Sequence, residues 1–145
     1  MEWKVKYVDA STALVKAFRK AKFRALRRLG YATMRRAQAS IHDEPGPSEP
    51  GTPPHTHPGE HTLGGSKKGQ LPISIKYATE KPGPESLDAV IIGPSEQIVG
   101  PAGKPHEHGG WFRGMHYEAR PFMGPALGEE AGELPGLLAE ENAKV

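Results

Sequence analysis

Three histidines lie close together at positions 55, 57 and 61, and imidazoles at this spacing could share a zinc ion. Glu60 could add an oxygen ligand. The same segment is rich in proline, and it contains neither a cysteine nor the HExxH pattern of a zinc-binding helix. We therefore expect a solvated polar loop. Metal binding through His55, His57 and His61 stays as an alternative.

A second group of ionisable side chains, His106-Glu107-His108, has the residue types that transfer protons. General acid–base catalysis would also need a nucleophile or a paired carboxylate nearby, and the sequence identifies neither. The glycine-rich segment 64–69 lacks the residue order of a phosphate-binding loop, and no helix is expected after it. We therefore expect a structural turn at Glu107, with no catalytic site and no cofactor.

Positive charge is concentrated at the beginning of the chain. Residues 1–41 contain eleven Lys or Arg and two acidic residues, whereas residues 42–145 contain eight Lys or Arg and fifteen acidic residues. Such a polarised chain favours association with an anionic surface or head-to-tail contact between copies.

Lysine and arginine neutralise phosphates whatever the base sequence, so any DNA binding should be non-specific and sensitive to salt. The candidate DNA-facing residues are Arg24, Arg27, Arg28, Arg35 and Arg36. The alternatives are a solvated helix face, or a face that meets acidic segments of neighbouring subunits.

A long helix over residues 9–41 is predicted to present these arginines, with Asp9 or Ser11 as its N-cap. Its apolar residues fall within a sector about 140° wide, which is a normal core-facing stripe. They are Leu14, Val15, Phe18, Ala21, Ala25, Leu26, Leu29, Ala32 and Thr33. Arg36 projects onto the centre of this stripe, so we expect the buried face to end, or the helix to bend, near Gly30.

The opposite face of this helix carries Phe23, Tyr31 and Met34 among basic residues. This combination indicates a second contact surface. A solvated face with scattered hydrophobic residues is the alternative, because single exposed apolar residues are normal.

The rest of the chain predicts a single α+β domain over residues 1–145, in which the long helix packs on a small, mainly antiparallel sheet at 71–119. An extended loop should cover 43–70, with another at 97–105. Strands are expected at 1–8, 71–77, 87–95, 111–113 and 115–119, with 71–77 and 87–95 forming an antiparallel hairpin. Helices are expected at 121–132 and 134–143, within a C-terminal helix and acidic tail over 121–145.

Composition adds two constraints. Residues 45–145 contain all 15 prolines and 17 of the 18 glycines, so much of this part should be loop or should be ordered by neighbouring subunits. The absence of cysteine excludes disulfides and thiolate sites. No signal-peptide core or membrane-length apolar run is evident, so we expect a soluble protein made in the cytoplasm.

Five segments occur in an order and spacing that resemble the small tail-completion, or head–tail connector, proteins of long-tailed bacteriophages, which are minor tail components. These segments are residues 50–54 (PGTPP), 69–75 (GQLPISI), 90–93 (VIIG), 106–110 (HEHGG) and 120–127 (RPFMGPAL). The similarity extends roughly over residues 10–130. Departures are an insertion at 55–68, Gly124 where a larger residue is common, and an acidic tail after residue 128.

The resemblance implies a structural protein of the virion, assembled in the host cytoplasm, without catalytic residues. It implies a homo-oligomeric ring at the phage neck or head-proximal tail, between neighbouring neck or connector and tail-tube proteins. The ring would surround the packaged DNA, which basic side chains could contact without sequence specificity. Candidate contacts with subunits and partners are Phe23, Tyr31, Met34, Glu107, Arg120, Phe122 and Met123.

The last motif also has a physical interpretation. Phe122, Met123, Ala126 and Leu127 are expected to pack a short helix against the sheet and the long helix. We expect Pro121 to lie in the first turn of that helix, where proline costs no hydrogen bond.

Overall fold

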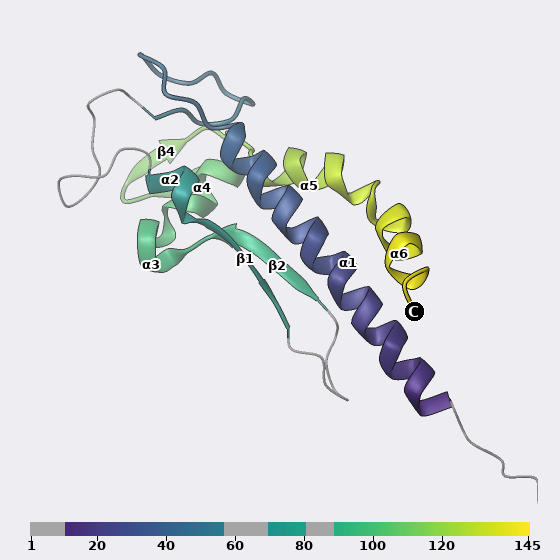
Figure 1. Cartoon of the computed structure of the whole chain (residues 1–145). Helices are drawn as coiled ribbons and strands as arrows, with labels where there is room; N and C mark the ends of the chain where they lie inside the picture. Colours follow the sequence, from purple (N-terminus) through teal and green to yellow (C-terminus); the bar gives the residue numbers. More distant parts are fainter. Residues whose placement is uncertain (1–10, 57–69, 81–88) are drawn as a thin grey trace, which may run out of the picture.

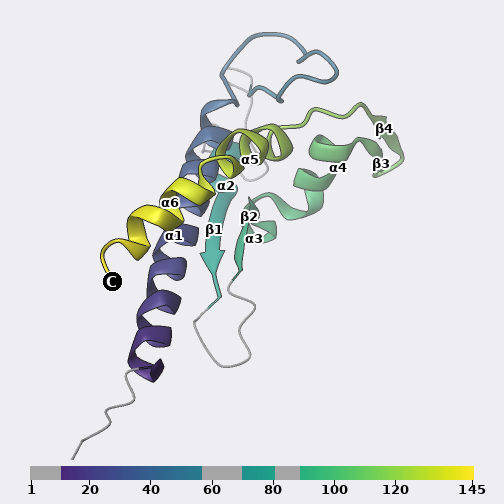
Figure 2. The same ribbon diagram turned by 90° about the vertical axis from the view of Figure 1, so that its right-hand side faces the viewer.

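The computed structural model describes residues 11–56, 70–80 and 89–145. A long helix, α1 (Ser11–Ala39), has a β-hairpin on one side and two short helices on the other (Figures 1 and 2). The hairpin consists of β1 (Ile75–Thr79) and β2 (Val90–Pro94), and the helices are α5 (Met123–Ala131) and α6 (Leu134–Asn142). This arrangement confirms the predicted α+β fold. The strand expected at 1–8 lies outside the described residues.

The predicted long helix is confirmed, but its buried face lies further along the chain than expected. It begins at Ala21 and extends to Ala37, and α1 continues through Gly30 as one element. A Cβ atom at Gly30 would lie 2.6 Å from Val90 Cγ2 and 3.0 Å from Tyr77 Cδ2. Gly30 is therefore the point of close approach to the hairpin, and the buried face does not end there.

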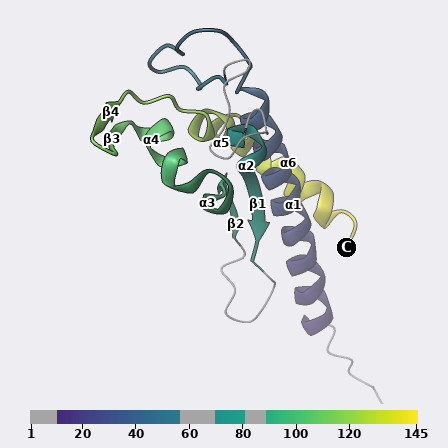
Figure 3. The ribbon, with the colours of Figure 1, turned by 90° about the vertical axis from the view of Figure 1, so that its left-hand side faces the viewer.

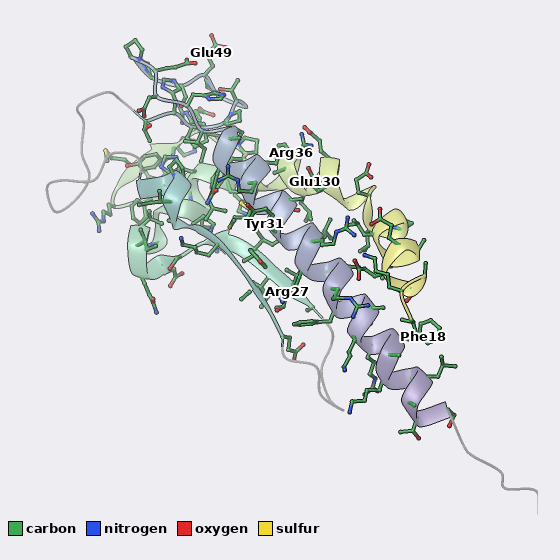
Figure 4. The ribbon with its side chains drawn as sticks, in the orientation of Figure 1. Phe18, Arg27, Tyr31, Arg36, Glu49 and Glu130 are labelled. Carbon is green, nitrogen blue, oxygen red and sulfur yellow. The ribbon has the colours of Figure 1, made fainter. Side chains whose placement is uncertain are left out.

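The beginning of α1 is exposed where the stripe predicted burial. Leu14, Val15 and Phe18 are 51%, 52% and 44% exposed. This part of the helix extends beyond the described elements that cover the remainder, and Phe18 lies on it in Figure 4. Periodicity identified the apolar face correctly, but it could not show where the covering elements stop.

The predicted antiparallel hairpin is confirmed, with Ile75 opposite Pro94 and Thr79 opposite Val90. The strand expected at 71–77 is wrong in its first half, where α2 (Gln70–Ser74) forms a short helix. Its last turn is closed by Ser74, whose Oγ donates a hydrogen bond to the Leu71 carbonyl at 2.6 Å. This local bond gives the backbone an alternative to strand pairing.

The loop expected at 97–105 is also wrong, because this segment forms three helical turns. They are α3 (Glu96–Val99), a 3-10 turn η1 (Gly100–Ala102) and α4 (Gly103–His108). Gly100, with φ of +60°, ends α3 in a conformation that favours glycine. The glycines and prolines that indicated a loop therefore separate short helices.

The predicted strands around Gly114 form a second, separate antiparallel pair, β3 (Gly110–Phe112) and β4 (Met115–Tyr117). The two-residue turn between them has positive φ at both Arg113 (50°) and Gly114 (78°), as a type I′ hairpin turn requires. This hairpin lies at the edge of the molecule away from α1 (Figure 3).

The hydrophobic core lies against the second half of α1. It consists of Ala37, Ile41, Ile75, Phe122 and Ala126. Partly buried side chains packed against it are Met34, Leu71, Ile92 and Met123. Of the four residues expected to pack this short helix, Phe122, Met123 and Ala126 lie in or against the core, whereas Leu127 is exposed.

One detail of α5 differs from expectation. The helix begins at Met123 with Phe122 as its N-cap, so Pro121 precedes the helix and Pro125 lies in its first turn.

Among the described residues, no helix is both long and apolar enough to cross a membrane.

Candidate functional site

The two motifs that carry most of the resemblance meet in the structure. Glu107, near the end of α4, accepts backbone hydrogen bonds from Phe122 and Met123 at 2.9 Å through Oε2. Its Oε1 accepts another from Gly124 at 2.7 Å. The carboxylate thus satisfies three N–H groups at the N-terminus of α5, where the helix dipole also favours negative charge.

This arrangement explains the glycine at position 124. A Cβ atom there would lie 3.1 Å from Glu107 Oε1, tight enough that the carboxylate would have to shift. The structural turn predicted at Glu107 is wrong, since Glu107 lies in helix α4, and the sequence did not indicate its partner. Fifteen residues separate Glu107 from Phe122, and no local periodicity connects them.

Arg120 connects the same motif to the proline-rich loop. Its guanidinium donates to the Ser48 carbonyl through Nε at 3.2 Å and Nη2 at 3.1 Å. The backbone N–H of Arg120 donates to the His106 carbonyl at 2.6 Å. Arg120 therefore holds three chain segments together.

Burial, and secondarily the positive charge of Arg120, lowers the pKa of His106.

The other residues proposed as subunit contacts occupy different environments. Phe122 is 1% exposed and Met34 and Met123 pack against the core, so these three serve the fold. Phe23 is half-buried beside the guanidinium of Arg27. Tyr31 is 54% exposed and lies edge-on to Tyr77.

Three of the five candidate DNA-facing arginines make ion pairs within the chain. Arg36 bonds to Glu129 and, at 2.5 Å, to Glu130, which extends toward it from α5 (Figure 4). The two others, Arg24 and Arg28, pair with α6. Acidic segments of neighbouring subunits were one alternative partner for this basic face, and in the structure acidic residues of the same chain contact it.

The contacts between α1 and α6 centre on Glu141. Its carboxylate lies 2.6 Å from Arg24 Nε, 3.2 Å from Arg28 Nη1 and 2.7 Å from Lys144 Nζ. Arg28 Nη1 also lies 2.6 Å from Glu140. Hydrogen bonds lower the pKa of Glu141 to about 2, and the bond from Lys144 has a larger effect than the bond from Arg24.

Arg27 and Arg35 have no carboxylate partner within the described ranges. The Arg27 guanidinium carbon lies 6.0 Å from the centroid of the Phe23 ring, and Arg35 contacts the Gln38 side chain at 3.5 Å. A pocket of about 330 Å³ opens between α1, β1 and α6. Its lining consists of Arg24, Arg27, Arg28, Tyr31, Tyr77 and Glu141.

The sequence identified the arginines of this pocket but not its other walls. Tyr77 comes from β1 and Glu141 from α6, 46 or more residues after Tyr31. Only the folded chain brings them beside α1. The acidic residues of the expected C-terminal helix, together with the basic N-terminal helix, were the available signal.

The β3–β4 hairpin presents a second exposed apolar surface. Trp111 is 76% exposed and Met115 is 57% exposed. The Trp111 ring lies edge-on to His116, directly opposite it in the hairpin. Large exposed side chains of this kind are typical of contact surfaces.

The histidine loop is only partly described. His57 and His61 lie outside the described residues, and His55 Nδ1 lies 3.2 Å from the Glu44 carbonyl oxygen. Within 11–56, 70–80 and 89–145 no three His, Cys, Asp or Glu side chains are grouped to hold a metal ion.

Comparison with protein-family models, curated proteins and solved structures finds no match to this chain.

Proposed function

We propose that this chain is a structural subunit of a phage neck or head-proximal tail, where several copies form a ring around the DNA path. Neighbouring connector and tail-tube proteins would lie above and below the ring. The observation that carries the proposal is the contact of Glu107 with the backbone of residues 122–124. Two of the five motifs that carry the resemblance are thereby parts of one structural unit.

The distribution of exposed apolar side chains supports assembly into a ring. One apolar surface is at the beginning of α1, at Leu14, Val15 and Phe18, and the other is at Trp111 and Met115 on the β3–β4 hairpin. They lie at different ends of the molecule (Figures 2 and 3). Two different surfaces on one subunit suit heterologous contacts, which close into rings when the rotation allows.

Electron microscopy of a lysate from a producer that lacks this gene tests the proposal. We expect filled heads and finished tails lying apart, which purified protein should join. The double variant Phe18→Ser/Trp111→Ser should fail to join them, whereas Ile91→Ser, at another exposed site, should succeed. Normally joined particles in the deletion lysate would contradict the neck function.

Non-specific DNA binding outside any particle is the second candidate, and the exposed cations of α1 favour it. This function predicts tight binding to free duplex DNA that weakens steeply with salt, without a stable protein partner. A protein that joins heads to tails yet binds free DNA weakly would exclude it.

A further inference from the structure

We infer that the pocket between α1, β1 and α6 binds the phosphates of a nucleic-acid backbone, and that Glu140 and Glu141 of α6 occupy its arginines when no nucleic acid is bound. The inference concerns the isolated protein. It does not depend on the neck function, because the pocket can be tested without any particle.

The pocket already holds an anion, the carboxylate of Glu141. This side chain is only 4% exposed, yet three cationic groups reach it, from Arg24, Arg28 and Lys144. Their bonds hold its pKa at about 2, so the carboxylate is charged at neutral pH. The surroundings of Glu141 therefore favour a negative group on this side of α1.

The cations exceed the carboxylates that neutralise them. Arg24, Arg27, Arg28 and Lys144 face only Glu140 and Glu141 in the described part of the chain. Arg27 lines the pocket without a carboxylate partner there. An incoming phosphate would thus meet at least one available guanidinium, a group suited to bidentate phosphate contacts.

The tyrosines of the pocket add uncharged donors. Tyr31 and Tyr77 approach each other edge-on, with ring centroids 6.3 Å apart. Neither hydroxyl has a hydrogen-bond partner among the described residues. Hydroxyl donors beside arginine are common contacts to phosphate oxygens in nucleic-acid complexes.

A polymer of phosphates fits this surface better than a single phosphate. Lys16, Lys20, Arg24, Arg27 and Arg35 lie within a sector of about 100° on α1. The first and last of them are roughly 30 Å apart along the helix axis. The pocket is therefore one part of a longer basic track that could follow several phosphates.

α6 is suited to leave the pocket. Among its residues only Glu141 is buried, and its leucines are at most half-buried. Its attachment to α1 therefore depends strongly on ion pairs, which salt weakens and phosphates can replace. Figure 1 shows α6 lying along α1.

Fluorescence anisotropy with labelled duplex DNA of mixed sequence tests the inference on the full chain. Glu140→Gln/Glu141→Gln should tighten binding roughly 10-fold or more near 0.1 M salt, because the pocket arginines Arg24 and Arg28 lose their carboxylate partners. The slope of log K against log salt should steepen by about 2 units. Unchanged affinity and slope would overturn the inference.

A matched control separates the pocket from total charge. Glu129→Gln/Glu130→Gln changes the net charge equally but releases Arg36, which is outside the pocket lining. We expect a clearly smaller effect. Equal tightening by both double variants would mean a general charge effect and would overturn the assigned site.

Two further measurements cover the case in which the α6 variant does not fold. In the wild-type background, Arg27→Ala should weaken DNA binding more than Lys76→Ala, an exposed cation on β1. Amide exchange in residues 134–142 should accelerate when DNA binds. Equal losses for the two variants, or an α6 that stays equally protected with DNA bound, would overturn the inference.

Inorganic phosphate serves as the probe for a single anion. If millimolar phosphate competes only weakly with DNA, the polymer is the ligand, as inferred. If phosphate alone binds as tightly as DNA, the site recognises a small anion and the nucleic-acid assignment is wrong.

Discussion

The two parts of α1 carry the same apolar stripe but have different surroundings. Up to residue 20, large side chains such as Leu14 and Phe18 face solvent. From residue 21 onward, the stripe is buried against the hairpin and the C-terminal helices, and its buried members are mostly small, as at Ala21, Ala25 and Gly30. The part that is covered within the chain has the smaller side chains.

This difference has a steric reason. Small residues let α1 approach the hairpin closely, as the position of Gly30 against Val90 shows. Large apolar residues in the uncovered part stay about half exposed, although their exposure in water is unfavourable. The covered part therefore maintains the fold, and the uncovered part is the one available for association.

The largest expected effect comes from replacing one leucine by alanine in each part of α1 and comparing the losses of stability. Leu29 is 5% exposed in the covered part, and Leu29→Ala should lower the free energy of unfolding by about 3 kcal/mol. Leu14 is 51% exposed, and Leu14→Ala should change it by less than about 0.5 kcal/mol. Urea denaturation of both variants provides the measurement. Similar losses at the two sites would mean that the beginning of α1 is also covered in the isolated protein.

Gly30 offers a second matched pair. Gly30→Ala should destabilise by about 1–3 kcal/mol, because the new methyl group would overlap Val90 in the covered part. Gly128, within α5, has no atom within 4 Å of an added Cβ, so Gly128→Ala should stabilise by about 0.5–1 kcal/mol. Thermal unfolding distinguishes these opposite signs. A stabilising Gly30→Ala would show that the hairpin can move away from α1.

These examples also show what the sequence could and could not predict. The helix itself, the β1–β2 hairpin and α5 follow from local periodicity and turn residues, which act over a few positions. The short helix at 70–74 was missed because Leu71, Ile73 and Ile75 alternate as in a strand, and those at 96–108 were missed because their glycines and prolines indicated a loop. Their helical turns are specified by local bonds such as Ser74 to Leu71.

The candidate site was less predictable than the fold. The basic residues of α1 were evident, but their pairing with Glu140 and Glu141 joins positions more than 100 residues apart. Charge asymmetry indicated that such pairing was favourable without indicating whether it would occur within one chain or between copies. The contact of Glu107 with α5 was also missed, because no local pattern connects residues 15 positions apart.

The contact of Glu107 in α4 with the start of α5 gives a third prediction. Glu107→Ala should destabilise by about 1–2 kcal/mol, because three N–H groups at the start of α5 lose their acceptor. Glu118→Ala, at an exposed carboxylate near the same motif, is the control and should have little effect. Equal effects of the two substitutions in urea denaturation would contradict the capping role.

The smallest expected effect concerns Glu141, which ties α6 to the covered part of α1. Its pKa falls from 4.5 to about 2 on folding, so its contribution is fully present above pH 4.5 and is lost as the pH falls toward 2. The lowered pKa of His106 also makes acid destabilising, but it acts in a higher window, as the pH falls below 6.5. Denaturation measured across pH should therefore show that Glu141→Gln flattens only the decline below pH 4.5. If the decline below pH 4.5 were the same in the variant as in the wild type, the ion pairs of α6 would contribute little to holding it on α1.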